Sequence, residues 1–377
     1  MGTALLFEAY PHVYGGAQQV TRALARHLPR AGWEPVVVMT GDGPVADLLR
    51  ADGVRVQVVA APPALDVYGE GLRSRRAAPA ALALPRYWSR LRRALAGAAV
   101  AYTATLRGTI LAGPAARLAR VPLVWHAQGF EAGGVATVTA GLLARRVLAA
   151  SDAVAATVRG RRRVEVVPPP WDPPGAPTLP RPPAEGGMGR AGPVIVTVGR
   201  LHPDKGIDVL VDAVARLRAT WPDVTVRVLG GAQAGHDRYA ERVRQKVVDL
   251  GLEGVVELCG FDAVPAVAVA AADVYVQPSR RESVGMATME AMAIGRPVIA
   301  SRVDGLAQLV DDGRTGLLVP PDDPEALATA LDRVLADPAL ATSLGAAAAG
   351  AERRGPDVVV DRLAHVFAEL ARPGSDR

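Results

Sequence analysis

The chain has few aromatic residues and a single cysteine, and both scarcities limit what it can be. Phe, Trp and Tyr together make up 4% of the 377 residues, so a core must be built mainly from Ala, Val and Leu. Cys259, the only cysteine, excludes an internal disulfide framework and fits a reducing compartment. Half of the residues are hydrophobic and 21% are charged, which allows a large folded core and excludes extended disorder.

Targeting and membrane signals are also missing. No apolar run reaches the ~18 residues of a membrane span, and Thr3–Phe7 is too short for a secretion signal. The chain is therefore expected to be soluble and cytoplasmic, with at most peripheral contact at the inner membrane face. The formal net charge of +5 suits an anionic ligand, but no basic-aromatic motif or basic stripe indicates nucleic acid as a partner.

Metal-binding patterns are a further absence. The sequence contains no Asp-x-Asp, and no group of His and Cys residues has the spacing of metal ligands. We therefore expect neither a metal ion nor another cofactor.

Short β-prone runs alternate with longer helical stretches along almost the whole chain, which is typical of βαβ units and a parallel sheet. The segment 168–192 interrupts this pattern with nine prolines and five glycines, and we interpret it as a linker. The sequence predicts an α/β protein with a Rossmann-like N-terminal acceptor domain at 1–167 and a Rossmann-like C-terminal nucleotide-sugar domain at 193–355. A terminal segment, 356–377, carries an amphipathic helix that can pack back on the N-terminal domain. Two doubly wound sheets of this kind, the GT-B type, place a ligand at the carboxyl ends of their strands, in an interdomain cleft.

The predicted elements follow from the same alternation. Strands are expected at Thr3–Phe7, Pro35–Met39, Val54–Val58, Ala99–Tyr102, Pro122–His126, Ala153–Thr157, Pro193–Val198, Val224–Leu229, Val255–Leu258, Val274–Gln277, Pro297–Ala300 and Gly316–Val319. Helices are expected at Gly16–Pro29, Ala81–Ala96, Gly133–Ala149 and Asp357–Ala371, and after each of the first four strands of the second domain.

The strongest candidate for a site is the stretch 278–297, which follows the predicted strand Val274–Gln277. A helix is expected to begin near Gly285 and to end at Gly295, a residue type that commonly terminates helices. This arrangement places the beginning of the stretch in a loop at the mouth of the crevice.

Two glutamates flank the start of that helix. Glu282 would lie in the loop, and Glu290 about one turn into the helix. The amides of Val284, Gly285 and Met286 would point outward at the helix amino end, where unpaired N–H groups and the dipole favour a phosphate. A carboxylate on each side of an anion site can accept hydrogen bonds from hydroxyls, one from a sugar and the other from a ribose.

The segment Glu282-x7-Glu290 resembles the E-x7-E motif of the retaining GT-B glycosyltransferases, in particular glycosyltransferase family 4 (group 1). The segment 199–206, Gly-Arg-Leu-His-Pro-Asp-Lys-Gly, resembles the family's G-R-x4-K-G segment after the first strand of the second domain. The resemblance implies that Gly199, Arg200 and Lys205 bind the donor diphosphate. A bidentate Arg beside a point-charge Lys suits two leaving phosphates, and as surface cations both should add little to folding stability.

Two positions of the first domain also resemble the family. Gly15 and Gly16 belong to a glycine-rich first loop, where backbone can close on the diphosphate or the acceptor. His126 ends a predicted strand, where the family often places a histidine that contacts the donor sugar.

The sequence departs from the family at two places. Where the family has G-G-x-P-E, Asp304 replaces a Gly, Ala307 the Pro and Gln308 the Glu. A contact from that Glu cannot be assumed here. Ser283-Val284 stands where Gly-Phe is commoner, which can reshape the sugar pocket.

The resemblance implies a retaining, metal-independent hexosyltransferase that moves a sugar from a nucleoside-diphosphate donor to an acceptor hydroxyl. The implied catalytic residues are Glu282, His126, Arg200 and Lys205. The implied donor-binding residues are Gly15, Gly16, Gly199, Arg200, Lys205, Glu282, Val284, Gly285, Met286 and Glu290. A nucleotide-sugar epimerase of the same architecture is an alternative, and so is a two-domain ligand-binding protein, although the latter class would need a secretion signal.

The sequence does not identify the acceptor. It should bind the first domain along the loop from Ala60 to Pro79 and the helix after it, which carries four arginines: Arg86, Arg90, Arg92 and Arg93. The acceptor could be a lipid-linked sugar, a cyclitol or a small natural product, and the donor base and sugar are equally open, as is the oligomeric state.

Overall fold

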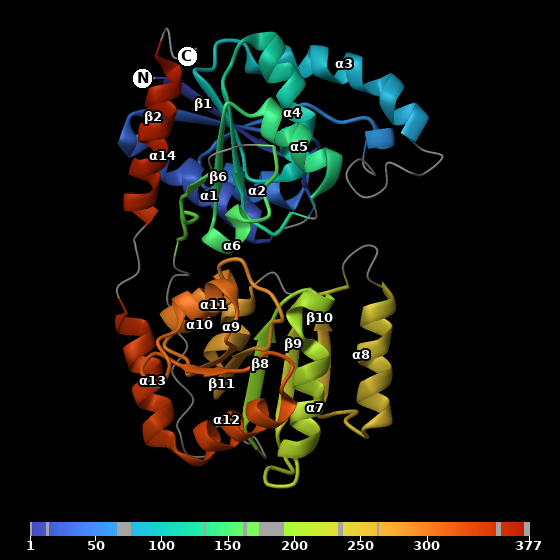
Figure 1. Cartoon of the computed structure of the whole chain (residues 1–377), viewed down its shortest axis with the longest axis vertical. Helices are drawn as coiled ribbons and strands as arrows, with labels where there is room; N and C mark the ends of the chain where they lie inside the picture. The colour runs from blue at the N-terminus through green and yellow to red at the C-terminus, as the bar shows by residue number, and fades with distance from the viewer. Residues whose placement is uncertain are drawn as a thin grey trace. The chain divides into compact units, whose positions relative to one another are not determined.

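The computed structural model describes residues 2–12, 15–65, 77–131, 133–160, 164–172, 192–232, 237–261, 264–351 and 356–372. The chain divides into two compact units (Figure 1). Unit 1 comprises Met1–Asp172 together with Arg354–Arg377, and unit 2 comprises Pro173–Arg353. Each unit contains one parallel sheet, which confirms the predicted α/β class.

Unit 1 is built on a seven-stranded sheet in the order β3-β2-β1-β4-β5-β6-β7, with every neighbouring pair parallel. Its strands are β1 Gly2–Glu8, β2 Trp33–Met39, β3 Arg55–Val58, β4 Val100–Thr103, β5 Leu123–Ala127, β6 Arg146–Ala149 and β7 Glu165–Val166. Its helices are α1 Gly16–His27, η1 Leu28–Ala31, α2 Pro44–Ala51, η2 Pro63–Leu65, α3 Ala77–Leu95, α4 Leu106–Ala119, α5 Gly134–Leu143, α6 Asp152–Ala155 and α14 Pro356–Ala371.

Side chains of the inner strand β1 point alternately to the two faces of this sheet and are buried on both. Ala4 and Leu6 belong to a core with α1, α2 and α14, to which α14 contributes Phe367. Leu5 and Phe7 belong to a separate core with α3 and α4 (Figure 1). Because successive side chains of a strand point to opposite faces, one apolar run fills two layers.

Unit 2 repeats the design with six parallel strands in the order β10-β9-β8-β11-β12-β13. Its strands are β8 Val194–Val198, β9 Thr225–Leu229, β10 Val256–Gly260, β11 Val274–Gln277, β12 Val298–Ser301 and β13 Leu317–Val319. Its helices are η3 Pro203–Lys205, α7 Ile207–Leu217, α8 Asp237–Asp249, α9 Pro265–Ala270, α10 Met286–Ala293, α11 Asp304–Leu309, α12 Pro324–Ala336 and α13 Pro338–Gly350. One core joins the sheet to α7, α8 and α12, and another joins it to α9, α10, α11 and α13.

The strand order decides where a ligand can bind in each unit. In both sheets the chain first proceeds outward to one side and then returns to the other side of the first strand. The order reverses between β1 and β4 in unit 1, and between β8 and β11 in unit 2. In doubly wound sheets the crevice for a ligand lies at this point, outside the carboxyl ends of the strands. The loops after β8 and β11 therefore flank the expected site of unit 2.

Two of the predicted elements are wrong. Ala153–Thr157, predicted as a strand, contains the end of the short helix α6, and Ser151 caps that helix by accepting a hydrogen bond from the Val154 N–H. The corresponding strand, β6, lies earlier, inside the predicted helix Gly133–Ala149. Helix α5 ends at Leu143 because Ala144 turns to an extended conformation.

Over the residues that the structure describes, no helix combines the length and the apolar character that crossing a membrane requires.

Candidate active site

The loop after β8 carries the first group of candidate residues in unit 2. Gly199 N–H donates to the Leu229 carbonyl, and a Cβ at Gly230 would lie 2.0 Å from the Gly199 oxygen. The loop ends in η3 and in Gly206, which has φ +61°. A Cβ at Gly206 would lie 1.9 Å from the Pro278 carbonyl oxygen, so only glycine permits this approach to the loop after β11.

Lys205 and Glu282 meet where these two loops approach each other. Lys205 Nζ lies 2.5 Å from Glu282 Oε2, and the two side chains are 19% and 11% exposed to solvent. The Ser279 hydroxyl also donates to Glu282 Oε2, at 3.5 Å. The structure therefore brings together a cation and a carboxylate that lie 77 residues apart in the sequence.

Helix α10 begins shortly after Glu282 in the chain. It follows Gly285, which has φ +86°, and the chain turns again at Gly295 with φ +79°, so the predicted start and end of the helix are confirmed. The first intrahelical hydrogen bond runs from the Met289 N–H to the Gly285 carbonyl. The amides of Val284 and Met286 precede that bond and are among the groups that a helix start leaves without an intrahelical acceptor.

Glu290 lies on α10 and is partly buried. The buried phenol of Tyr275 on β11 is close enough to sense both glutamates. Burial raises the pKa of Tyr275, and the charges of Glu290 and Glu282 raise it further. The two glutamates therefore influence the same buried group.

Sequence analysis missed a row of polar side chains that is linked to Glu282 through the Ser279 hydroxyl. The Tyr275 hydroxyl donates to Gln277 Oε1 at 2.6 Å, and Gln277 Nε2 donates to Ser279 Oγ at 2.8 Å. All three residues are buried. Their spacing of two residues places them on one face of an extended chain, and this polar alternation in an apolar strand is the signal that could have revealed them.

The departure at Asp304 has a structural account. Asp304 has φ +37°, a left-handed conformation that non-glycine residues adopt rarely and that Asp tolerates better than most. Its Oδ2 accepts a hydrogen bond from the Glu282 N–H at 3.4 Å, and the Gly305 N–H donates to the Glu282 carbonyl. Asp304 thus stands in a glycine position and holds the backbone of Glu282. Ala307 and Gln308 are exposed.

Arg200 lies at the start of the loop after β8, and its side chain is exposed. Its role at the diphosphate, like those of the other candidate residues, stays a prediction. Within the described residues, no three His, Cys, Asp or Glu side chains form a group that could hold a metal ion.

In unit 1 the candidate glycines follow β1, beyond Val13 and Tyr14, which lie outside the described residues. The Gly15 N–H donates to Gln18 Oε1 at 3.1 Å, and Gln18 Nε2 donates to Glu8 Oε1 at 3.0 Å. Burial raises the pKa of Glu8, against the lowering effect of these hydrogen bonds. The glycine loop is therefore tied to a buried carboxylate that the sequence analysis did not identify.

His126 is completely buried in unit 1. One ring nitrogen, Nδ1, lies 2.9 Å from the Tyr102 hydroxyl, and Nε2 lies 2.7 Å from the Val167 carbonyl oxygen. Because a carbonyl can only accept, Nε2 carries the proton and Nδ1 accepts from Tyr102. Burial lowers the pKa of His126 to about 4, so the ring is neutral at pH 7. This geometry favours a structural histidine, and a contact with a donor sugar stays a prediction.

A second carboxylate that sequence analysis missed follows β5. The Glu131 N–H donates to the Thr157 hydroxyl at 3.1 Å, and burial raises the pKa of Glu131 to about 7. A carboxylate with a raised pKa that follows the carboxyl end of an inner strand is a candidate for ligand binding.

The predicted acceptor region is described only in part, because residues 66–76 lie outside the described residues. Helix α3 exposes its four arginines, and Arg90 Nη1 donates to the Ala60 carbonyl at 3.3 Å.

Comparison with known proteins agrees with this fold. Residues 192–337 match the family model described as glycosyl transferases group 1, and residues 15–164 match the glycosyl transferase 4-like domain. Among solved structures, Anabaena Alr3699/HepE in complex with UDP-glucose has a TM-score of 0.82 at 24% sequence identity, over 98% of this chain and 100% of that one. Sucrose-phosphate synthase from Thermosynechococcus elongatus has a TM-score of 0.76 at 23% identity, over 98% and 99% of the two chains.

Curated relatives match over a shorter range. D-inositol 3-phosphate glycosyltransferase of Streptomyces bingchenggensis is 40% identical over 182 residues, which is 46% of this chain and 40% of that protein. Alpha-D-kanosaminyltransferase of Streptomyces kanamyceticus is 30% identical over 183 residues, or 47% and 46% of the two chains. The chain thus spans less than half of the length of these curated relatives.

The two doubly wound units and the matches that cover most of both define the GT-B fold of the glycosyltransferases. The chain belongs to the group 1 glycosyltransferases, of the GT4 type.

Proposed function

We propose that the chain moves a sugar from a nucleoside-diphosphate donor to an acceptor hydroxyl, with retention of the anomeric configuration and without a metal ion. The Lys205–Glu282 pair supports this proposal most directly, because it lies beside the amino end of α10, between the loops after two adjacent strands. A cation and helix-start amides suit a diphosphate, and a carboxylate suits sugar hydroxyls.

The proposed reaction breaks the bond between the sugar C1 and the oxygen of the β-phosphate. The acceptor oxygen attacks C1 from the face that the diphosphate leaves, and its proton passes to the departing phosphate. The products are the glycoside and a nucleoside diphosphate. Lys205, Arg200 and the amides at α10 would stabilise the charge that develops on the leaving group. Exclusion of water would limit hydrolysis of the donor.

Solved neighbours and curated relatives guide the choice of substrates. Anabaena Alr3699/HepE has been solved in complex with UDP and with UDP-glucose, which supports a hexose donor of this kind. The curated relatives are named for D-inositol 3-phosphate and for a kanosaminyl group, which supports cyclitols and small natural products as the first acceptors to test. No cofactor is proposed, because the cations and amides of the chain can neutralise the diphosphate by themselves.

The test begins with a screen of nucleotide sugars for protection against thermal unfolding, since a ligand that binds the folded state raises the melting temperature. The stabilising donor is then incubated with a panel of acceptors, with Glu282→Gln as the matched inactive variant. Nucleoside diphosphate should appear only when both substrates are present. Conversion of the donor alone into an epimer would overturn the proposal in favour of the epimerase.

A further inference from the structure

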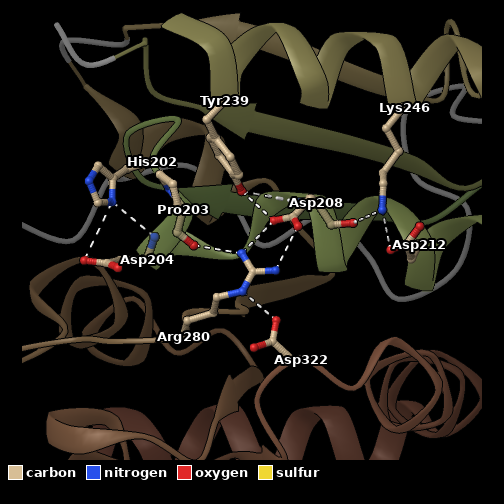
Figure 2. Close-up of polar contacts among 9 residues, drawn as sticks. All are labelled: His202, Pro203, Asp204, Asp208, Asp212, Tyr239, Lys246, Arg280 and Asp322. Atoms are coloured by element: carbon tan, nitrogen blue, oxygen red, sulfur yellow. Dashed lines mark hydrogen bonds and ion pairs between the residues drawn. The ribbon is translucent and has the colours of Figure 1, made fainter. Parts of the chain in front are cut away.

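Arg280 connects the two loops that carry Lys205 and Glu282, and no function was assigned to it from the sequence. Figure 2 shows its guanidinium group between the loop after β8 and the start of α7. Nη1 and Nη2 bind the two carboxylate oxygens of Asp208 at 2.9 and 2.8 Å. Nη1 also donates to the Pro203 carbonyl at 2.8 Å, and Nε donates to Asp322 at 2.5 Å.

The backbone of the same segment makes a second connection. The N–H groups of Arg280 and Arg281 both donate to the Asp204 carbonyl, at 2.8 and 3.2 Å. We call the contacts of Arg280 with Pro203, Asp204, Asp208 and Asp322 the Arg280 clasp. Arg280 is the one residue of the clasp that touches all the others.

The carboxylate of Asp208 is held in place by a second donor besides Arg280. Its Oδ1 also accepts the hydroxyl of Tyr239, a buried residue of α8, at 2.6 Å (Figure 2). Burial raises the pKa of Asp208, but the hydrogen bonds from Arg280 and Tyr239 outweigh it and leave that pKa below its ordinary value. The carboxylate therefore stays ionised at neutral pH, and two donors hold it in place.

We propose that Arg280 is a positioning residue that keeps Lys205 and Glu282 in register, so that both act on one bound donor. The proposal rests on the proposed function. Lys205 directly follows Asp204, whose carbonyl accepts both amide hydrogen bonds, and Glu282 lies two residues after Arg280. A movement of one loop past the other would therefore separate the pair. A displacement of about 1 Å in a catalytic arrangement can reduce turnover by ~10²-fold.

The chain offers a matched control on the same helix. Lys246 Nζ binds Asp212 Oδ2 at 2.5 Å, with exposures of 32% and 31% that resemble the 28% of both Arg280 and Asp208. Figure 2 shows this pair, which joins α7 to α8, beside the Arg280 contacts. Lys246 Nζ also donates to the Asp208 backbone carbonyl at 3.5 Å. Lys246→Met thus removes an ion pair of similar exposure and this one long hydrogen bond, and leaves the Asp208 carboxylate and every contact of the Arg280 guanidinium in place.

The first experiment compares Arg280→Met, Arg280→Lys and Lys246→Met in wild-type assay conditions, well below the melting temperature. Arg280→Met should lower kcat at least tenfold and change the donor KM less than threefold, whereas Lys246→Met should leave both near wild type. Arg280→Lys should be intermediate, because an ammonium group cannot bind the Asp208 carboxylate through two parallel N–H groups. If Arg280→Met does not fold, Arg280→Lys and Asp208→Asn make the same comparison.

A double-mutant cycle separates positioning from a structural role. If Arg280 acts through Lys205, then adding Arg280→Met to Lys205→Met should lower kcat less than threefold further, because there is no longer a cation to position. Multiplicative losses in the double variant, or a kcat for Arg280→Met equal to that of Lys246→Met, would overturn the proposal. An absence of transfer by the wild-type chain with every donor and acceptor would instead refute the proposed function, so the two failures are distinguishable.

Discussion

Removal of the Lys205 ammonium group is the perturbation for which the structure gives the sharpest expectation. Its Nζ lies 2.5 Å from Glu282 Oε2, and the side chains are only 19% and 11% exposed. Two charges about 4 Å apart attract each other by ~4 kcal/mol at an effective dielectric constant of about 20. Loss of hydration offsets much of this, but removing one partner of a buried pair still costs ~3–5 kcal/mol, because the other charge is left unpaired. Since the pair is not fully buried, we expect Lys205→Met to lower the free energy of unfolding by ~2–3 kcal/mol.

This expectation differs from the one based on sequence, in which Lys205 is a surface cation of little consequence for folding. Unit 2, Pro173–Arg353, is of a size for which each kcal/mol shifts the melting temperature by about 2–4 °C. Lys205→Met should therefore melt roughly 4–12 °C below wild type. Lys246→Met, which loses a more exposed pair, should cost only ~0–1 kcal/mol.

Kinetics supply the second half of this test. Loss of one preorganised donor at a developing charge costs about two to three orders of magnitude in kcat, and Lys205→Met should fall in that range with saturating donor. Adding Glu282→Gln should raise the melting temperature again without restoring turnover, because a neutral amide does not need a cation beside it. A Lys205→Met variant with the melting temperature of Lys246→Met and near-normal turnover would show that the Lys205–Glu282 pair neither stabilises the fold nor serves the reaction.

Three further predictions concern the glutamates, metal ions and pH. Glu290→Ala should weaken donor binding, measured as Kd, while Glu282→Ala should mainly lower kcat; unchanged values in both would remove them from the site. Activity should survive an excess of EDTA, and a loss that Mg²⁺ or Mn²⁺ reverses would show that an ion neutralises the diphosphate. The pKa of His126 is about 4 in the fold and 6.5 ordinarily, so the unfolded chain binds its proton first as the pH falls. The free energy of unfolding should thus fall by ~3 kcal/mol between pH 6.5 and 4 on account of His126. His126→Gln should make this fall shallower in thermal melts, and an identical pH dependence in both proteins would contradict the assignment.

Much of the fold could be predicted from the sequence because it depends on local patterns. The alternation of apolar strands and helices located both sheets, and glycine chemistry located the ends of α10 at Gly285 and Gly295. The error at Ala153–Thr157 has the same origin, since a short apolar run fits a strand and a helix equally well. There the hydrogen bond from the Val154 N–H to the Ser151 hydroxyl marks the start of a helix.

The site could be predicted only as a set of separate residues. Motif spacing identified Lys205 and Glu282, but not that they touch, because the contact joins loops 77 residues apart. The same holds for the pairing of Arg280 with Asp208 across 72 residues. The hydrogen bonds of the buried His126 go to Tyr102 and to the Val167 carbonyl, and no local pattern connects either of them with it.

Sugar transfer with retention of configuration can be followed directly at the anomeric carbon. The purified chain is incubated with the donor selected by thermal protection and with an acceptor, and ¹H NMR follows the anomeric signals of donor and product. We expect one glycoside for each nucleoside diphosphate released, with the anomeric configuration of the donor and no product from Glu282→Gln. A glycoside of inverted configuration, or an equal yield from Glu282→Gln, would contradict this expectation.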